Sequence, residues 1–159
     1  MFERFTKDAH MAVTAAVEEA QKRSDARIGN EHLLLGVAGS AGAPTGLDLA
    51  ELRLELDRLD GKALEAVGID PGLLDVGPSQ SPEPAGKKHL PFTGAAKDTL
   101  TNALKEAIAL EHRHIGVEHI ALALTTLPES DRATRVLAAR GLVPDQLRRT
   151  LLETLRKAS

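Results

Sequence analysis

The 159 residues include no cysteine, no tryptophan and no tyrosine, and only three phenylalanines. Without cysteine the chain has no disulfide, no thiol nucleophile and no thiolate ligand for a metal ion. No apolar run approaches the roughly 18 residues that a membrane-spanning helix needs, and the N-terminal segment lacks the apolar region of a signal peptide. We therefore expect a cytoplasmic protein that does not associate with membranes.

Neither sign of charge is in large excess, since the formal net charge is -3 and no block of lysine or arginine stands out. Nucleic-acid binding normally requires a basic patch, so a nucleic-acid partner is not expected. The chain has no phosphate-binding loop of the form G-x-x-x-x-G-K-[ST], which excludes ATP hydrolysis by that machinery.

What the sequence does contain is a repeat. The stretch RIGNEHLLLG at residues 27–36 returns as HIGVEHIALA at residues 114–123, which is 87 positions later. The same offset maps Phe5 and Thr6 onto Phe92 and Thr93. It also maps one helical face onto another, with Ala9, Val13, Ala16, Val17 and Ala20 matching Ala96, Leu100, Ala103, Leu104 and Ala107. A duplicated unit therefore decides the architecture.

Each copy begins with the same two predicted helices. In the first copy a long helix covers residues 6–23, and Thr6 and Thr93 stand where an N-cap hydroxyl is favoured. A second helix begins at Asn30 in one copy and at about residue 117 in the other, with Glu31 and Glu118 in its first turn, where the helix dipole favours a carboxylate. The histidine that follows each glutamate is expected to be buried or half-buried and hydrogen-bonded to the backbone.

The later part of each copy is less regular. Segments 61–70 and 134–146 are predicted helices that end at Gly68 and Gly141, and a fourth helix covers residues 145–157 in the second copy but only about 70–77 in the first. We predict an all-α fold of two four-helix repeats related by a pseudo-two-fold axis. Repeat 1 covers 1–76 with an insertion around 39–61, a linker covers 77–89, and repeat 2 covers 90–159, together forming one compact domain. A lengthened third helix explains the insertion better than a separate partner-binding helix.

The opening MFERFT, the doubled IGxEH phrase and the PFT of the second copy resemble the Clp N-terminal repeat domain, the substrate-receptor module at the front of ClpC-type AAA+ unfoldases. With no phosphate loop present, the resemblance implies a non-enzymatic receptor module of the Clp proteolysis system. Its partners would be substrate or adaptor proteins and peptides, and it would be able to modulate a ClpC-type unfoldase. A free-standing protein and an N-terminal receptor domain excised from a full-length ClpC-type ATPase both remain open.

In this family some members take up proteins that carry phosphorylated arginine. The resemblance implies that Glu31 and Glu118 would receive the guanidinium, for which a carboxylate is the preferred bidentate partner. Thr6 and Thr93 would meet the phosphate at helix N-termini. A cofactor or a metal is not implied.

The chain departs from the family where an arginine usually follows that threonine by two positions. Asp8 stands there in the first copy and Ala95 in the second, so the site of the second copy, formed by Thr93 and Glu118, is expected to be the better preserved. Binding of unmodified peptides or adaptors on the same surface is the more general expectation.

A second implied surface is the patch where cyclic-peptide antibiotics engage the family. Phe2, Phe92 and Lys97 match that patch, with His10 where a basic arginine is common. Phe5, the repeat mate of Phe92, is expected to pack against the first helix instead. An apolar anchor beside a cation suits a peptide hot spot.

Two further hypotheses remain beside the receptor. One is a small metal- or carboxylate-dependent hydrolase built on Glu111, His112, His114 and Glu118, although their spacing suggests neither turnover nor a zinc site. The other is a protein that sequesters antimicrobial cyclic peptides on the antibiotic-binding surface.

Overall fold

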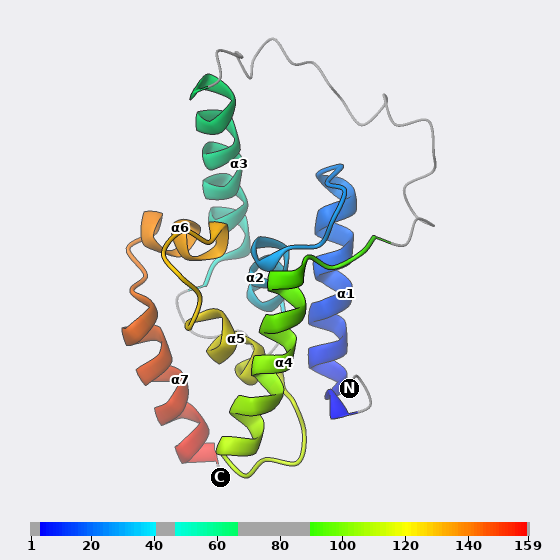
Figure 1. Cartoon of the computed structure of the whole chain (residues 1–159). Coiled ribbons are helices and arrows are strands. Elements are labelled where there is room, and N and C mark those ends of the chain that lie inside the picture. Colours follow the sequence, from blue (N-terminus) through cyan, green and yellow to red (C-terminus); the bar gives the residue numbers. More distant parts are fainter. Residues whose placement is uncertain (1–3, 41–46, 67–89, 159) are drawn as a thin grey trace.

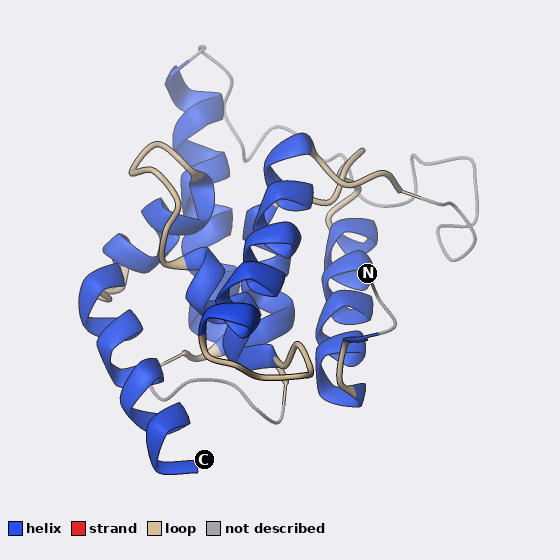
Figure 2. Ribbon diagram, turned by 60° about the horizontal axis from the view of Figure 1, so that its bottom comes forward, coloured by secondary structure: helices blue, strands red, loops and turns tan. Residues whose placement is uncertain are grey.

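The computed structural model describes residues 4–40, 47–66 and 90–158, and within these ranges it contains seven helices and no strand (Figures 1 and 2). The first repeat supplies α1 (Lys7–Lys22), α2 (Asn30–Ala38) and α3 (Leu49–Ala66). The second repeat supplies α4 (Gly94–Ala109), α5 (Val117–Leu124), α6 (Arg132–Ala139) and α7 (Pro144–Ala158). The predicted all-α fold is confirmed. The short helix predicted at 70–77, Gly68, the linker 77–89 and Phe2 lie outside the described residues.

The helix boundaries follow from local capping. Thr6 and Thr93 are the N-caps of α1 and α4, and their hydroxyls accept hydrogen bonds from the backbone amides of Ala9 at 3.1 Å and Ala96 at 3.0 Å. Such a bond satisfies one of the four amides that a helix start leaves without a partner. The predicted caps and the predicted starts of α2 and α5 are confirmed.

The core is built around α2 and α5, which are the most apolar helices and are buried on nearly every face. Small side chains of α1 and α4 line the surfaces on which α2 and α5 pack. These side chains are Ala9, Ala12, Ala16 and Ala20 on α1 and Ala96, Ala103 and Ala107 on α4. Alanine at these positions lets the axis of the neighbouring helix approach closely.

The two repeats are joined by backbone hydrogen bonds that cross between them. Phe5 forms a parallel bridge with Ile115, and its repeat mate Phe92 forms one with Ile28. The bonds run from Thr6 N–H to Ile115 O (2.9 Å), Ile115 N–H to Arg4 O (2.9 Å), Ile28 N–H to Pro91 O (2.8 Å) and Thr93 N–H to Ile28 O (2.9 Å). Each contact has a mate 87 positions away, which is the reciprocity of a two-fold interface.

The third helices break this symmetry. α3 is one continuous helix that includes much of the predicted insertion, and Leu52 and Leu56 are each only 1% exposed. It packs on α2 of its own repeat and on α6 of the other, so the prediction of a lengthened third helix is confirmed. α6 ends before Gly141, whose φ of 73° is the left-handed conformation that glycine adopts without strain.

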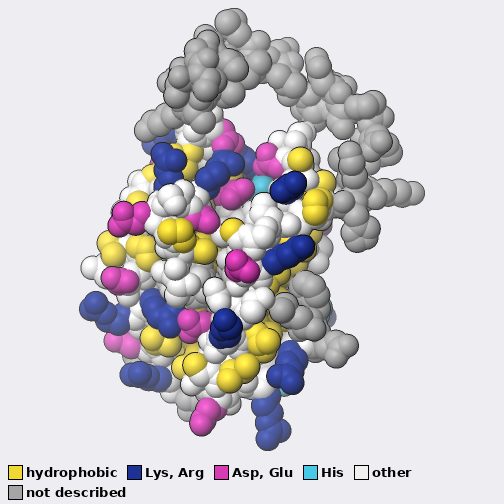
Figure 3. All heavy atoms as spheres, viewed as in Figure 1, with side chains coloured by type: hydrophobic (Ala, Val, Ile, Leu, Met, Phe, Trp, Pro, Cys, Tyr) yellow, Lys and Arg dark blue, Asp and Glu magenta, His cyan; other side chains and the backbone are white. Residues whose placement is uncertain are grey.

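Two properties of the molecule bear on its partners. On the face shown in Figure 3, lysine and arginine side chains are interspersed with acidic ones rather than gathered in one basic area. Among the described residues, none of the helices has the combination of length and apolar character needed to cross a membrane.

We predict that Gly36→Ala destabilises the fold. A Cβ at Gly36 of α2 would overlap the backbone carbonyl oxygen of Ala12 on α1, and a backbone atom cannot move aside as a flexible side chain does. Overpacking of this kind costs about 1–3 kcal/mol, which corresponds to a fall in melting temperature of about 2–4 °C per kcal/mol for a chain of this size.

The matched control is Gly94→Ala in the first turn of α4, where an added Cβ meets nothing within 4 Å. Thermal unfolding followed by circular dichroism should show a loss for Gly36→Ala and no loss for Gly94→Ala. Equal melting temperatures for the two variants would refute the close approach of α1 and α2.

Candidate binding site at the repeat junctions

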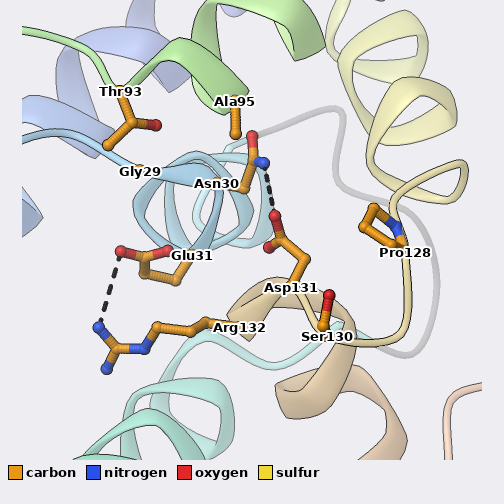
Figure 4. Close-up of a pocket in the computed structure, with 9 residues that line it drawn as sticks. All are labelled: Gly29, Asn30, Glu31, Thr93, Ala95, Pro128, Ser130, Asp131 and Arg132. Carbon is orange, nitrogen blue, oxygen red and sulfur yellow. Dashed lines mark hydrogen bonds and ion pairs between the residues drawn. The ribbon is translucent and has the colours of Figure 1, made fainter.

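The crossed hydrogen bonds bring the start of each first helix beside the IGxEH phrase of the other repeat, and a pocket lies at each junction. We call the first the Glu31 pocket; its cavity is about 390 Å³ in volume. Gly29, Asn30, Glu31, Thr93, Ala95, Pro128, Ser130, Asp131 and Arg132 line it (Figure 4).

The second, the Glu118 pocket, has a volume of about 470 Å³. Thr6, Glu111, His112, Arg113, His114, Gly116, Glu118, His119 and Leu155 line it. Each pocket therefore combines the N-cap threonine of one repeat with the glutamate of the other.

The structure corrects the expected pairing of these residues. The sequence suggested that Thr93 and Glu118 of the second copy share a site, but Thr93 lines the pocket of Glu31, and Thr6 lines that of Glu118. Ala95 accordingly faces the Glu31 pocket, whereas Asp8 is exposed and is not among the residues that line the Glu118 pocket. Neither pocket belongs to one copy alone, and which of the two is better preserved stays a prediction.

Both glutamate side chains fold back over the glycine that precedes their helix. A Cβ at Gly29 would lie 2.6 Å from Glu31 Oε1, and one at Gly116 would lie 2.5 Å from Glu118 Oε2. Glycine thus leaves room for the carboxylate, which sits at the N-terminal end of α2 or α5 where the helix dipole stabilises it. The Glu31 side chain is 15% exposed, so its carboxylate remains accessible from the pocket.

The histidines of the two phrases fix these helix starts. Gly29 N–H donates to Nδ1 of His32 at 2.9 Å, and Gly116 N–H donates to Nδ1 of His119 at 2.8 Å, so each imidazole takes the place of the usual glutamate of a capping box. Both rings are buried. The prediction of buried histidines hydrogen-bonded to the backbone is confirmed.

The partners of the opposite ring nitrogens differ between the repeats. Because Nδ1 accepts a bond, the proton is on Nε2. His32 Nε2 donates to Asp25 at 2.7 Å, whereas His119 Nε2 donates to Nδ1 of His112 at 2.8 Å. Asp25 and His112 are related by the repeat offset of 87, so one carboxylate position has become an imidazole.

These partners set different proton affinities. Burial would raise the pKa of Asp25, but the hydrogen bond from His32 and the charges of His32, Arg23 and Arg132 bring the pKa below its usual value. Burial, together with the nearby His112, lowers the pKa of His119 to about 4, and Glu106 opposes this shift only in part.

Asn30 shows a second divergence between the junctions. Its amide donates to Asp131 at 2.9 Å and its carbonyl oxygen accepts from the Thr99 hydroxyl at 2.6 Å. Asp131 in turn caps α6 by accepting from the amide of Ala133 at 2.9 Å. The repeat mate of Asn30 is the buried Val117, so only the Glu31 pocket has this polar network.

Among the described residues, the other predicted site residues, His10, Phe92 and Lys97, line neither pocket. Phe5 is 6% exposed, which confirms its packing role, and its ring centroid is 5.8 Å from that of exposed His10. Phe92 is half-buried and bridges to Ile28, and Lys97 is exposed on α4. The antibiotic surface stays a prediction, since Phe2 lies outside the described residues.

The four residues of the hydrolase hypothesis do gather in the Glu118 pocket. Nδ1 of His112 is already used, because it accepts a hydrogen bond from His119, the histidine that caps α5. Among the described residues, no group of three or more histidine and acidic side chains is arranged to hold a metal ion.

Several residues of the site could not be recognised as such from the sequence. The exchange of Asp25 for His112 is visible at the offset of 87 once the partner of each histidine is known. Asp131 and Arg132 reach the Glu31 pocket from the third helix of the opposite repeat, where the offset no longer holds, and no sequence signal indicates their place.

Comparison with known proteins identifies the kind of domain to which the second repeat corresponds. Residues 91–159 match the family model described as the Clp repeat (R) N-terminal domain. The second repeat of the chain thus matches this family.

Its relatives extend the likeness to the first repeat. The chain is 31% identical over 155 residues to the chloroplastic chaperone protein ClpC1 of Oryza sativa, covering 93% of the chain and 15% of the relative. It is 32% identical over 163 residues to a probable ATP-dependent Clp protease ATP-binding subunit of Chlamydia pneumoniae, covering 98% of the chain and 17% of the relative. The chain thus spans about one sixth of the length of these proteins.

A solved structure supports the fold as a whole. The N-terminal domain of the chaperone ClpD from Arabidopsis thaliana superposes with a TM-score of 0.71 at 22% identity, covering 98% of this chain and 99% of that one. At this identity the likeness concerns the fold alone.

We predict that the second repeat loses stability in mild acid because of His119. Its pKa is about 4 in the folded chain against 6.5 as its ordinary value. The unfolded chain therefore binds the proton more readily than the folded chain. The free energy of unfolding thus rises as the pH increases from about 4 to 6.5, and it reaches its full value above pH 6.5. Protonation of Nδ1 would also break the bond from Gly116.

His112→Asp should reduce this dependence, because a carboxylate in the place that Asp25 occupies in the other repeat stabilises the protonated imidazole. Urea unfolding at pH 4.5, 5.5 and 7 measures the slope. An equal slope for the variant and the wild type would contradict the assignment to the His112–His119 pair.

Proposed function

We propose that the chain is a non-enzymatic receptor module of a Clp proteolysis system, and that arginine side chains of substrate or adaptor segments bind at the junctions between its repeats. The observation that carries this proposal is the repeated placement of a carboxylate, Glu31 or Glu118, over a glycine at a helix start. The relatives, named as chaperones and as ATP-binding subunits of the Clp protease, support the system.

The chemistry of the pockets suits a guanidinium. Its planar fork of N–H donors is matched by a carboxylate that accepts two bonds, and a charge-assisted bond of this kind is stronger than a neutral one. On the opposite wall lies the N-terminus of α1 or α4, where backbone amides and a threonine hydroxyl favour an anion. A phosphorylated arginine side chain offers both groups, so arginine-phosphorylated proteins are included among the partners.

The relation to an unfoldase follows from this binding role. As part of a longer ClpC-type chain, the module would present substrates to the motor. As a separate chain, it would compete with the receptor domain of a ClpC-type unfoldase for the same substrates and adaptors, and so modulate it. We place both activities in the cytoplasm.

We predict saturable binding of free phosphoarginine in a calorimetric titration at neutral pH. Glu118→Gln should weaken binding about tenfold or more, because a hydrogen bond to a charged group contributes roughly 1.5–3 kcal/mol. Glu18→Gln, which removes an equal charge from an exposed position of α1 away from both pockets, is the control. If the wild-type protein does not bind phosphoarginine, the proposal is refuted.

A second ligand surface is proposed for the exposed Lys97 and half-buried Phe92, with Phe2 and His10 as the further residues implied by the family resemblance. Cyclic-peptide antibiotics are the expected ligands. Lys97→Ala should weaken binding of such a peptide severalfold and leave phosphoarginine binding unchanged, because Lys97 lines neither pocket. Fluorescence polarisation with a labelled cyclic peptide measures the first effect, and loss of both ligands together would contradict two separate surfaces.

A further inference from the structure

The two pockets differ in a way that the duplication does not explain, because in the Glu31 pocket an arginine of the chain itself faces the glutamate. Arg132, the first residue of α6, points along the pocket toward Glu31, with its Nη1 3.9 Å from Glu31 Oε1 (Figure 4). Its Nη2 forms an ion pair with Asp60 of α3. The carboxylate of Glu31, which we propose as the partner of a ligand guanidinium, therefore already faces the guanidinium of Arg132.

The Glu118 pocket has no such occupant among the described residues. Glu118 takes part in none of the ion pairs found there, and the wall contributed by the last helix is the apolar Leu155. The nearby Arg148 is engaged with Glu106 at 2.9 Å. Arg113 lines the pocket but is exposed, and among the described residues it forms no ion pair with Glu118. The carboxylate of Glu118 is thus open to a ligand.

We propose that Arg132 acts as an internal occupant of the Glu31 pocket, so that the chain offers one open arginine-binding pocket, that of Glu118. This inference rests on the proposed function and specifies which of its two pockets works. Arg132 is a specificity-determining residue in this sense: it sets the number of arginine side chains that one chain can hold.

The anchoring of Arg132 explains why a ligand does not simply displace it. The residue before it, Asp131, caps α6 and is held by Asn30 at 2.9 Å. The carboxylate of Asp60 that receives Arg132 is itself held by Arg23 at 2.8 Å. Displacement would disturb contacts of α1, α3 and α6 together.

The opposite role, in which Arg132 receives the phosphate of a ligand in place of the cation missing at Ala95, is disfavoured by charge. Two carboxylates, those of Glu31 and Asp60, already face this one guanidinium. A phosphate would have to compete with both of them for Arg132.

The experiment counts binding sites by calorimetric titration with phosphoarginine and, separately, with arginine amide. We expect one site in the wild type, which Glu118→Gln removes and Glu31→Gln leaves intact. Arg132→Met, which keeps an apolar stem in the wall, should reveal a second site that Glu31→Gln then removes.

Arg135→Met is the matched control, since Arg135 is an exposed arginine of the same helix and lines neither pocket. It should leave one site, and circular dichroism of each variant checks that the helices persist. Two sites in the wild type, or a single site in a folded Arg132→Met variant, would overturn the inference while leaving the receptor function standing.

Weaker phosphoarginine binding by Arg132→Met, with arginine amide unaffected, would also overturn it and assign Arg132 to the phosphate. If no variant and no wild-type sample binds either probe, the proposed function itself fails and the inference falls with it.

Discussion

The crossed backbone hydrogen bonds between the repeats are the constraint on which the rest of the structure depends. Each bond ties the entry of a first helix to the Ile-Gly turn of the other repeat, as Thr6 does with Ile115 and Thr93 with Ile28. Because that turn also starts α2 or α5, the same contact places a helix N-terminus opposite a carboxylate. The core packing, the capping histidines and the two pockets all meet at these junctions.

Duplication gave the two junctions a common plan, and single exchanges have made them chemically different. An imidazole at His112 in place of the carboxylate of Asp25 adds to the effect of burial in lowering the pKa of His119. Asn30 in place of Val117 gives the other junction a buried polar network that orients Asp131. These changes leave the backbone plan intact because each replaces one side chain within an otherwise conserved set of hydrogen bonds.

The sequence predicted the local features well and the non-local ones poorly, for a physical reason. Helix starts at Thr6, Asn30 and Thr93 depend on neighbours within one turn, so spacing and residue type suffice to find them. Whether Glu118 shares a pocket with Thr93 or with Thr6 depends on how the repeats dock, and both arrangements preserve the same internal offset. Arg132 could not be placed either, because α3 and α6 have diverged in length and no longer follow that offset.

The crossing of the junctions has a consequence for the history of such a domain. A polypeptide with one repeat and these same contacts would complete its pockets only as a symmetric pair of identical chains, and both pockets would then change together with every mutation. Joining the two copies in one chain removed that restriction. Each junction could then be altered alone, so that one pocket acquired an internal arginine while the other kept an open carboxylate.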